Sequence, residues 1–159
     1  MYRTGHYGVS LLVYAPFGAA LLVAGYRVPA LVGGAAMLAL APLPDYDQRV
    51  PFVRHRGITH TLVFAWLVGT TVGGLTLLLP AAGPEHLALA GFGFGVGALG
   101  VVAHLLGDVL TPAGIRPLWP LRDTRYSLAL WTADNALANY GLLGAGVAVT
   151  VAVLLLLLA

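Results

Sequence analysis

Seven histidine and aspartate residues stand at the ends of apolar segments, where their side chains could hold a metal ion. They are His6, Asp45, Asp47, His55, His60, His104 and Asp108. His104 and Asp108 are four positions apart, so on a helix they share one face. Such a pair can offer an imidazole and a carboxylate to one ion, or the carboxylate can orient the ligating histidine. The chain has no cysteine, and a site built from imidazoles and carboxylates suits Zn, Mn or Fe(II).

The carboxylates Asp45 and Asp47 lie in the segment PLPDYD, which contains Pro42 and Pro44. The two prolines are expected to end a helix. Residues two apart in an extended or turn segment can face the same way, so we expect both carboxylates to face one site. Several histidine and aspartate side chains could hold one ion or two, and two ions a few ångströms apart would suit hydrolysis of a phosphoester.

The segment HRGITHT passes from a loop into an apolar stretch. Gly57 permits a tight turn, and Thr59 is the expected N-cap of the helix that follows. His60 is then expected to begin that helix. Its side chain would project from a helix end, beside the loop that carries His55.

The composition predicts a membrane protein. The 159 residues are 59% hydrophobic and only 9% charged, whereas a soluble domain carries about 25% charged residues. A bilayer core needs about 20 helical residues, and five apolar segments reach or approach this length: residues 8–25, 28–43, 60–80, 86–107 and 138–159. We therefore expect an all-α, polytopic membrane bundle of about five transmembrane helices, forming a single integral membrane domain over residues 1–159. A cleavable signal peptide is the alternative interpretation of the first segment.

The placement of arginine predicts the orientation in the membrane. With five spans, the N-terminus, the second loop and the fourth loop share one side, which holds seven of the eight basic residues; Arg27 is on the other side. Cytoplasmic loops carry an excess of basic residues. We therefore predict a multi-pass protein of the inner (cytoplasmic) membrane, with its N-terminus in the cytoplasm and its C-terminus outside.

The seven histidine and aspartate residues fall on this same cytoplasmic side, although the arginines alone determined the topology. Each residue taken singly is more often a hydrated helix end, a helix cap or the partner of an arginine. Their shared side and depth favour a common functional site over these separate roles.

The long loop between the fourth and fifth apolar segments is rich in proline and aromatic residues. Trp119 and Trp131 suit the membrane interface, and we expect the loop to lie along the headgroups and partly cover the site. Arg116 and Arg122 in this loop, together with Arg56, are candidate substrate-binding residues because guanidinium groups bind phosphate. Contact with anionic lipid is the alternative role for each.

Three other features carry no expected chemistry. His86 falls on the opposite side of the membrane and is expected to be a solvated loop residue. The glycines from Gly91 to Gly100 are expected to allow close helix packing, since a glycine-rich nucleotide loop would follow a strand. The arginines form no basic tract of the kind that binds nucleic acid, so no nucleic-acid partner is expected.

The order of the segments GHYG, PLPDYD, HRGITHT and AHLLGDVLTPAG resembles the YdjM-type family of inner-membrane metal-dependent hydrolases. The resemblance extends from His6 to about Pro120, and its most specific parts are the HRG-x-TH and H-x3-D-x2-T blocks. It implies that the metal-site residues are His6, Asp45, Asp47, His55, His60, His104 and Asp108. The order of these residues also distantly resembles zinc-dependent phospholipase C, a soluble helical protein, which is an analogy only.

These features together predict an enzyme: a metal-dependent hydrolase at the cytoplasmic membrane surface. It would act on a phosphoester or ester of a lipid or lipid-linked substrate, because a soluble substrate would not need a five-helix anchor. The cofactor would be one or two divalent ions, with Zn expected ahead of the alternatives Mn and Fe. The first ligands would be His60, His104 and Asp108, with the site completed by His6 and His55. Asp45 or Asp47 would be a further ligand or the general base.

Two other functional classes are alternatives. A non-catalytic membrane interaction or regulatory protein would hold a structural metal in a closed coordination shell, whereas catalysis needs an open position. A transporter would place its site near the bilayer midplane, and the middle of each predicted span lacks ionisable residues. The sequence determines neither the substrate nor the oligomeric state.

The predicted topology can be tested with a fusion. A reporter that is active only outside the cytoplasm is expected to be active when it is fused after Ala159 and inactive when it is fused after the second predicted loop, because the two positions lie on opposite sides in the five-span topology. A C-terminal reporter that stays in the cytoplasm would contradict the five-span prediction.

Overall fold

The computed structural model describes residues 1–80 and 83–158, and within them the regular elements are helical. The α-helices are α1 (Arg3–Val23), α2 (Arg27–Leu40), α3 (Leu62–Thr76), α4 (Pro84–Val109) and α5 (Ala136–Leu158). Two short 3-10 helices, η1 (Pro44–Arg49) and η2 (Ile58–His60), lie between α2 and α3. The all-α prediction is therefore confirmed.

Four helical stretches are long and apolar enough to cross a membrane, namely Arg3–Val23, Arg27–Arg49, Pro84–Val109 and Ala136–Leu158. The second of these runs from α2 through η1. Helix α3 is apolar but has 15 residues, which at the rise of a helix is about 22 Å, less than the roughly 30 Å of a bilayer core. The structure is a polytopic helical membrane bundle in which α3 is shorter than its predicted segment.

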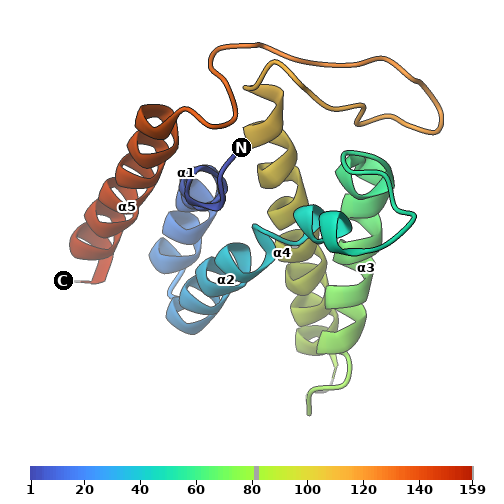
Figure 1. The fold of residues 1–159 in the computed structure, drawn as a ribbon. Helices are drawn as coiled ribbons and strands as arrows, with labels where there is room; N and C mark the ends of the chain where they lie inside the picture. The colour runs from blue at the N-terminus through green and yellow to red at the C-terminus, as the bar shows by residue number, and fades with distance from the viewer. Residues whose placement is uncertain (81–82, 159) are drawn as a thin grey trace.

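The helices form two side-by-side pairs, α1 with α5 and α3 with α4, and α2 contacts both α1 and α4 (Figure 1). Glycines bring the α3 and α4 backbones together, because a Cβ on Gly97 would lie 2.9 Å from the Cα of Gly69. Gly93 and Gly100 also face close neighbours, whereas Gly91 and Gly95 face open space. The expected packing role therefore applies to only part of the glycine series.

Glycines also set the contact of α1 with α5. A Cβ on Gly8 would overlap the backbone of Leu142, and a Cβ on Gly146 would lie 2.6 Å from the carbonyl oxygen of Gly8. Small residues permit such close approach between helices in a membrane. This contact fixes the first turn of α1, which carries His6.

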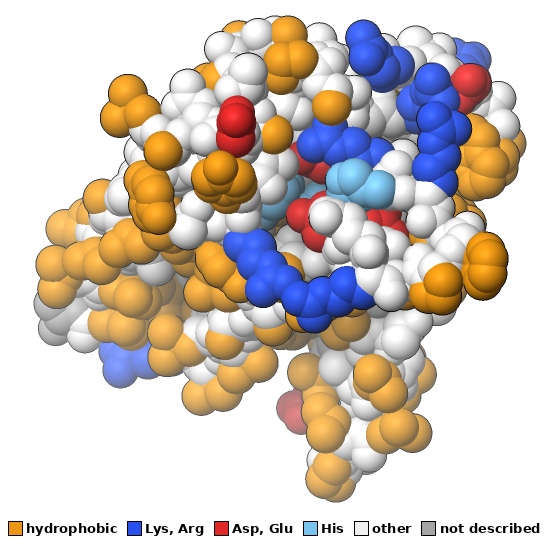
Figure 2. All heavy atoms as spheres, in the orientation of Figure 1, with side chains coloured by type: hydrophobic (Ala, Val, Ile, Leu, Met, Phe, Trp, Pro, Cys, Tyr) orange, Lys and Arg blue, Asp and Glu red, His pale blue; other side chains and the backbone are white. Residues whose placement is uncertain are grey.

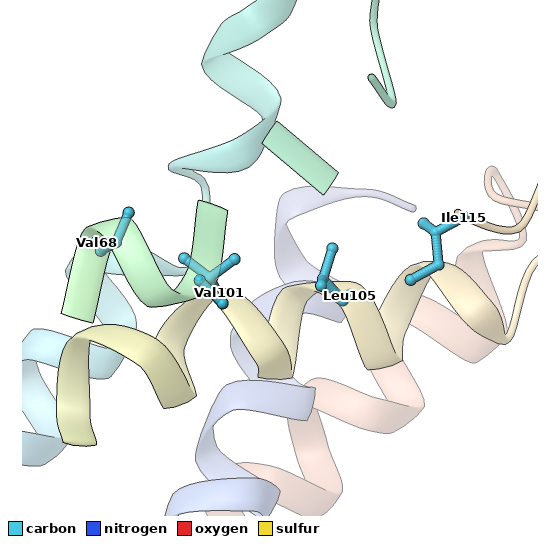
Figure 3. Packing of buried hydrophobic residues seen from close by; sticks show 5 residues of the cluster. Val68, Val101, Leu105 and Ile115 are labelled. Carbon is cyan, nitrogen blue, oxygen red and sulfur yellow. The ribbon is translucent and has the colours of Figure 1, made fainter. Parts of the chain in front are cut away.

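An apolar cluster joins α3, α4 and the long loop. It contains Ala65, Val68, Val101, Leu105 and Ile115, and Figure 3 shows how they lie. Ile115 comes from the loop and is 4% exposed. Its burial against Leu105 holds the start of the loop on the polar end of α4.

Backbone hydrogen bonds hold the rest of the long loop over the same end of the bundle (Figure 1). Ile115 and Tyr126 form an antiparallel bridge. The Leu62 N–H donates to the carbonyl oxygen of Pro117 at 2.8 Å, and the Leu128 N–H donates to that of Val109 at 2.7 Å. The loop is therefore fastened both to the start of α3 and to the end of α4.

Some local predictions were wrong. The segment with Asp45 and Asp47, expected to be extended or a turn, is a 3-10 helix. Residues two apart on such a helix point about 120° apart, so the two carboxylates do not face the same way. The N-cap of α3 is not Thr59 but Thr61, whose hydroxyl accepts from the Phe64 N–H at 3.1 Å. His60 accordingly belongs to η2, before the helix begins. His86 lies in the first turn of α4 and not in a loop.

The close contact of α1 with α5 predicts the effect of one methyl group. Gly8→Ala is expected to destabilise the folded protein by about 1–3 kcal/mol, because the new Cβ overlaps backbone that cannot rotate away. Thermal unfolding in detergent micelles measures the change. Gly144→Ala is the control: Gly144 is a helical glycine of α5, and a Cβ added there would have no atom within 4 Å, so this variant should be as stable as the parent or more so. Equal shifts in the two variants would contradict the packing argument.

Candidate metal centre

Histidine and aspartate side chains from four elements meet at the end of the bundle that the long loop covers. His6 comes from α1, Asp45 from η1, His60 from η2, and His104 and Asp108 from α4. The four side chains other than Asp45 are at most 1% exposed. Figure 2 shows histidine and acidic side chains on this face with basic side chains around them.

Four of these residues form what we call the metal quartet: Asp45, His60, His104 and Asp108. The Nε2 atoms of His60 and His104 are 3.2 Å apart. Oδ2 of Asp108 lies 3.3 Å from Nε2 of His60 and 3.5 Å from Nε2 of His104. Oδ1 of Asp45 lies 3.5 Å and 3.7 Å from the same two nitrogens. Tetrahedral ligands of Zn are about 3.3–3.4 Å from one another, so these separations suit one tetrahedral ion.

Hydrogen bonds orient both quartet histidines. Nδ1 of His104 is 2.7 Å from the carbonyl oxygen of Ala41, which can only accept, so this nitrogen carries the proton. Nδ1 of His60 is 2.9 Å from the hydroxyl of Thr59. That hydroxyl donates to Oδ2 of Asp47 at 2.6 Å, and it therefore accepts from His60. In the neutral rings both Nε2 atoms then carry lone pairs, which a metal ligand requires.

The polar atoms at the centre of the quartet are poorly satisfied by one another. Two nitrogen lone pairs that face each other at 3.2 Å repel, and Oδ2 of Asp108 is buried with no hydrogen-bond partner among the described residues. Buried polar atoms of this kind are rare in folded proteins. A divalent cation would accept all of these lone pairs, so the donor set fits a metal ion.

Without an ion, a proton on His60 relieves part of this repulsion. Burial disfavours the charged imidazole and lowers the pKa of His60, but the carboxylates of Asp108, Asp45 and Asp47 outweigh burial. The pKa of His60 therefore lies above its ordinary value of 6.5. Metal binding would have to displace this proton.

Asp47 lies next to the quartet, and both of its carboxylate oxygens already have hydrogen-bond donors. Its Oδ1 is 2.9 Å from Nδ1 of His55, and its Oδ2 accepts from the Arg56 N–H at 3.2 Å and from the hydroxyl of Thr59. This carboxylate therefore orients His60 through Thr59. Asp47, His55 and His60 also form a second group whose ligand atoms lie close enough for an ion, with the His55 side chain 42% exposed.

His6 lies beside the quartet and stacks on His104, with ring centroids 3.8 Å apart and planes 5° apart. Its Nε2 is 3.7 Å from Oδ1 of Asp108 and 3.9 Å from Oδ2 of Asp45. These are the carboxylate oxygens that the quartet does not use. Each of the two carboxylates thus directs one oxygen toward the quartet and the other toward His6.

The three predicted substrate-binding arginines have different positions. Nη2 of Arg56 donates to Oδ1 of Asp108 at 3.0 Å, and the Met1 amino group lies at the same distance from that oxygen. Arg116 and Arg122 lie exposed on the long loop, and Arg116 is 3.4 Å from Asp123. Only Arg56 touches the metal quartet.

Three polar groups at the site were not predicted as site groups, although Thr111 is the threonine of the H-x3-D-x2-T block. Thr111 is fully buried, and its hydroxyl oxygen accepts a hydrogen bond from Nη1 of Arg56 at 3.4 Å. Its position three residues after Asp108, just past the end of α4, could have placed it next to that carboxylate. Thr59 is a link between His60 and Asp47 and was expected to be a cap. The carbonyl of Ala41 orients His104, and a backbone group leaves no signal in the residue types.

Comparison with known proteins gives one match. The family described as "YdjM inner membrane protein" matches residues 1–159. No curated protein and no solved structure matches the chain significantly.

The quartet geometry predicts how metal content responds to substitution. Protein purified without a histidine tag is expected to retain about one equivalent of a divalent metal, and His60→Ala or His104→Ala should reduce it at least tenfold because each removes a ligand. Asp47→Asn should weaken metal affinity about 10–100-fold through loss of the orienting carboxylate. Elemental analysis and competition with a chelator measure both effects.

His86→Ala is the control for these variants. His86 lies in the first turn of α4, far from the C-terminal half of the helix that carries His104, and its Nε2 is 3.0 Å from the carbonyl oxygen of Leu77. The metal content of this variant should therefore equal that of the parent. Near-zero metal in the parent and all variants would refute the metal centre.

Proposed function

Because the chain belongs to the YdjM inner membrane protein family and carries a donor set that fits a metal ion, we propose that it is a membrane-embedded, metal-dependent hydrolase. It acts at the cytoplasmic membrane surface on a phosphoester or ester of a lipid or lipid-linked substrate. The enzyme uses one divalent ion at the metal quartet, with zinc as the expected metal.

One observation carries this proposal: the quartet is asymmetric. His60, His104 and Asp108 are fully buried, whereas the side chain of Asp45 is 18% exposed. Catalytic zinc sites use three protein ligands and leave one position for water or substrate, and structural sites close all four. Three buried donors with a solvent-accessible carboxylate at the fourth corner resemble the catalytic arrangement.

The residues of the site would have separate roles in metal binding, ligand orientation and proton transfer. A bound ion would lower the pKa of its water to about 7 and polarise the oxygen of the scissile group. His60, His104 and Asp108 would hold it, and the Thr59–Asp47 pair would keep His60 in the required orientation. Asp45 would accept the proton of the attacking water, because its carboxylate lies next to the ligands and can be reached by solvent.

A second candidate function is favoured by the number of donors. If Asp45 is a fourth ligand, two histidines and two carboxylates close a tetrahedral shell, and the ion is structural. The protein would then be a membrane interaction or regulatory module. The separations of 3.5 Å and 3.7 Å from Asp45 Oδ1 to the histidine nitrogens are compatible with this arrangement too.

The variant Asp45→Asn separates the two functions. If Asp45 is the general base, the variant should retain its metal and lose about 10²–10⁴-fold in kcat, since an amide cannot take up the proton. If Asp45 is a structural ligand, the variant should lose its metal. Hydrolysis of phospholipids and isoprenyl phosphates by protein in vesicles, before and after chelation, provides the activity measurement.

The control for these assays is His86→Gln, which leaves the quartet intact and should retain both metal and activity. The catalytic proposal fails if metal-loaded parent protein hydrolyses neither phosphoester nor ester lipids faster than the chelated protein does.

A further inference from the structure

A groove opens beside the metal quartet, between the segment that leads into η2 and the long loop. Its volume is about 570 Å³, within the range of small-molecule sites. Among its lining residues are Arg54, His55, Arg56, Arg116, Trp119 and Arg125. Half of the eight basic residues of the chain therefore line this one groove.

The groove has a strong excess of positive charge. None of its lining residues is acidic. The carboxylates that do contact its arginines lie outside the lining: Asp108 pairs with Arg56, and Asp123 pairs with Arg116. Within residues 1–80 and 83–158, no carboxylate lies within 4.0 Å of the guanidinium groups of Arg54 or Arg125. Two guanidinium groups at the groove thus have no ion-pair partner in the part of the chain that the structure describes.

Arg56 connects the groove with the metal quartet. Its side chain is 16% exposed, and its guanidinium group donates to Asp108, Thr111 and the carbonyl of Gly114. A guanidinium group has five N–H donors, so two remain for a ligand. Its backbone has a φ of 59°, a left-handed conformation that costs a non-glycine residue free energy and that often occurs at functional sites. This conformation presents its N–H to Asp47 while its side chain reaches Asp108.

We propose that this groove binds the phosphate group of the substrate, with Arg54 and Arg125 as the outer contacts and Arg56 as the contact next to the metal quartet. The inference rests on the proposed function and narrows it from phosphoesters and esters to phosphate compounds. Guanidinium groups bind phosphate through paired, charge-assisted hydrogen bonds. A carboxylic ester has no charge for these groups to bind, so the groove selects the phosphate-bearing class.

The rim of the groove suits a phosphate that is attached to an apolar chain. Phe52 and Val53 also line the groove. Phe52 is fully exposed, whereas Val53 and Trp119 are 36% and 41% exposed. Aromatic and apolar side chains of this kind lie at the membrane interface. A lipid phosphate could keep its chains in the bilayer while its headgroup enters the groove, and a soluble phosphate would use the same arginines.

The test uses Arg54→Gln, Arg125→Gln and the double variant in nanodiscs of zwitterionic lipid. Arg49→Gln is the matched control, since Arg49 is exposed near the same end of the bundle and does not line the groove. The probes are inorganic phosphate, glycerol 3-phosphate and phosphatidic acid, each titrated by calorimetry against metal-loaded and chelated protein. Loss of a charge-assisted contact should weaken phosphate binding about tenfold or more for each arginine in both metal states. Metal content should stay unchanged in every variant.

The outcomes distinguish the groove from the metal centre. Absence of phosphate binding by the parent, or equal weakening in Arg49→Gln, overturns the phosphate groove and leaves the hydrolase proposal intact. Arginine-dependent phosphate binding by a parent that takes up no divalent metal when it is supplied supports the groove and refutes the hydrolase proposal. Tighter binding of phosphatidic acid than of glycerol 3-phosphate assigns the site to a lipid headgroup, and equal binding assigns it to a soluble phosphate.

Discussion

Asp108 is a carboxylate with no exposed surface at the end of an apolar helix. A buried charge in a membrane bundle is expensive unless opposite charges, hydrogen bonds or a metal compensate it. The rest of this end of the protein supplies that compensation. His60 and His104 lie on one side of the carboxylate, and the guanidinium group of Arg56 lies on the other. Groups from α1, from η2 and from the segment between η1 and η2 thus meet at this carboxylate.

The apolar part of the bundle makes this convergence possible. Lipid gives helices no hydrophobic reason to associate, so their contacts depend on close van der Waals packing of small residues. Gly69 and Gly97 bring α3 to α4, and Gly8 and Gly146 bring α1 to α5. The histidine and aspartate residues lie beyond these contacts, at helix ends and in 3-10 turns. Packing of the apolar helices thus sets the positions of the groups that meet at this end of the bundle.

Arg56 lies between the metal quartet and the arginine-lined groove. The metal quartet is buried on one side of this residue, and the arginine-lined groove is open on the other. Hydrolytic sites commonly separate the group that binds the unreactive part of a substrate from the groups that act on the reacting bond, because binding at the first positions the second. Here a single side chain contacts both regions, so occupation of the groove and the geometry of Asp108 are physically linked.

Residue types and their order were enough to predict the membrane class, the helical architecture and the meeting of histidine and aspartate residues from separate segments. Hydropathy acts over whole segments, so errors at single positions do not disturb it. The pair His104 and Asp108 was also predictable, since helical spacing alone puts both on one face. The folded chain was needed to separate the quartet from its neighbours. It placed Asp45 against the histidines and Asp47 behind them, whereas the extended or turn segment expected from the sequence had both carboxylates facing one way. It also revealed the Ala41 carbonyl and the groove, because a backbone acceptor and a space between distant segments arise from the packing of elements and are encoded in no single stretch of residues.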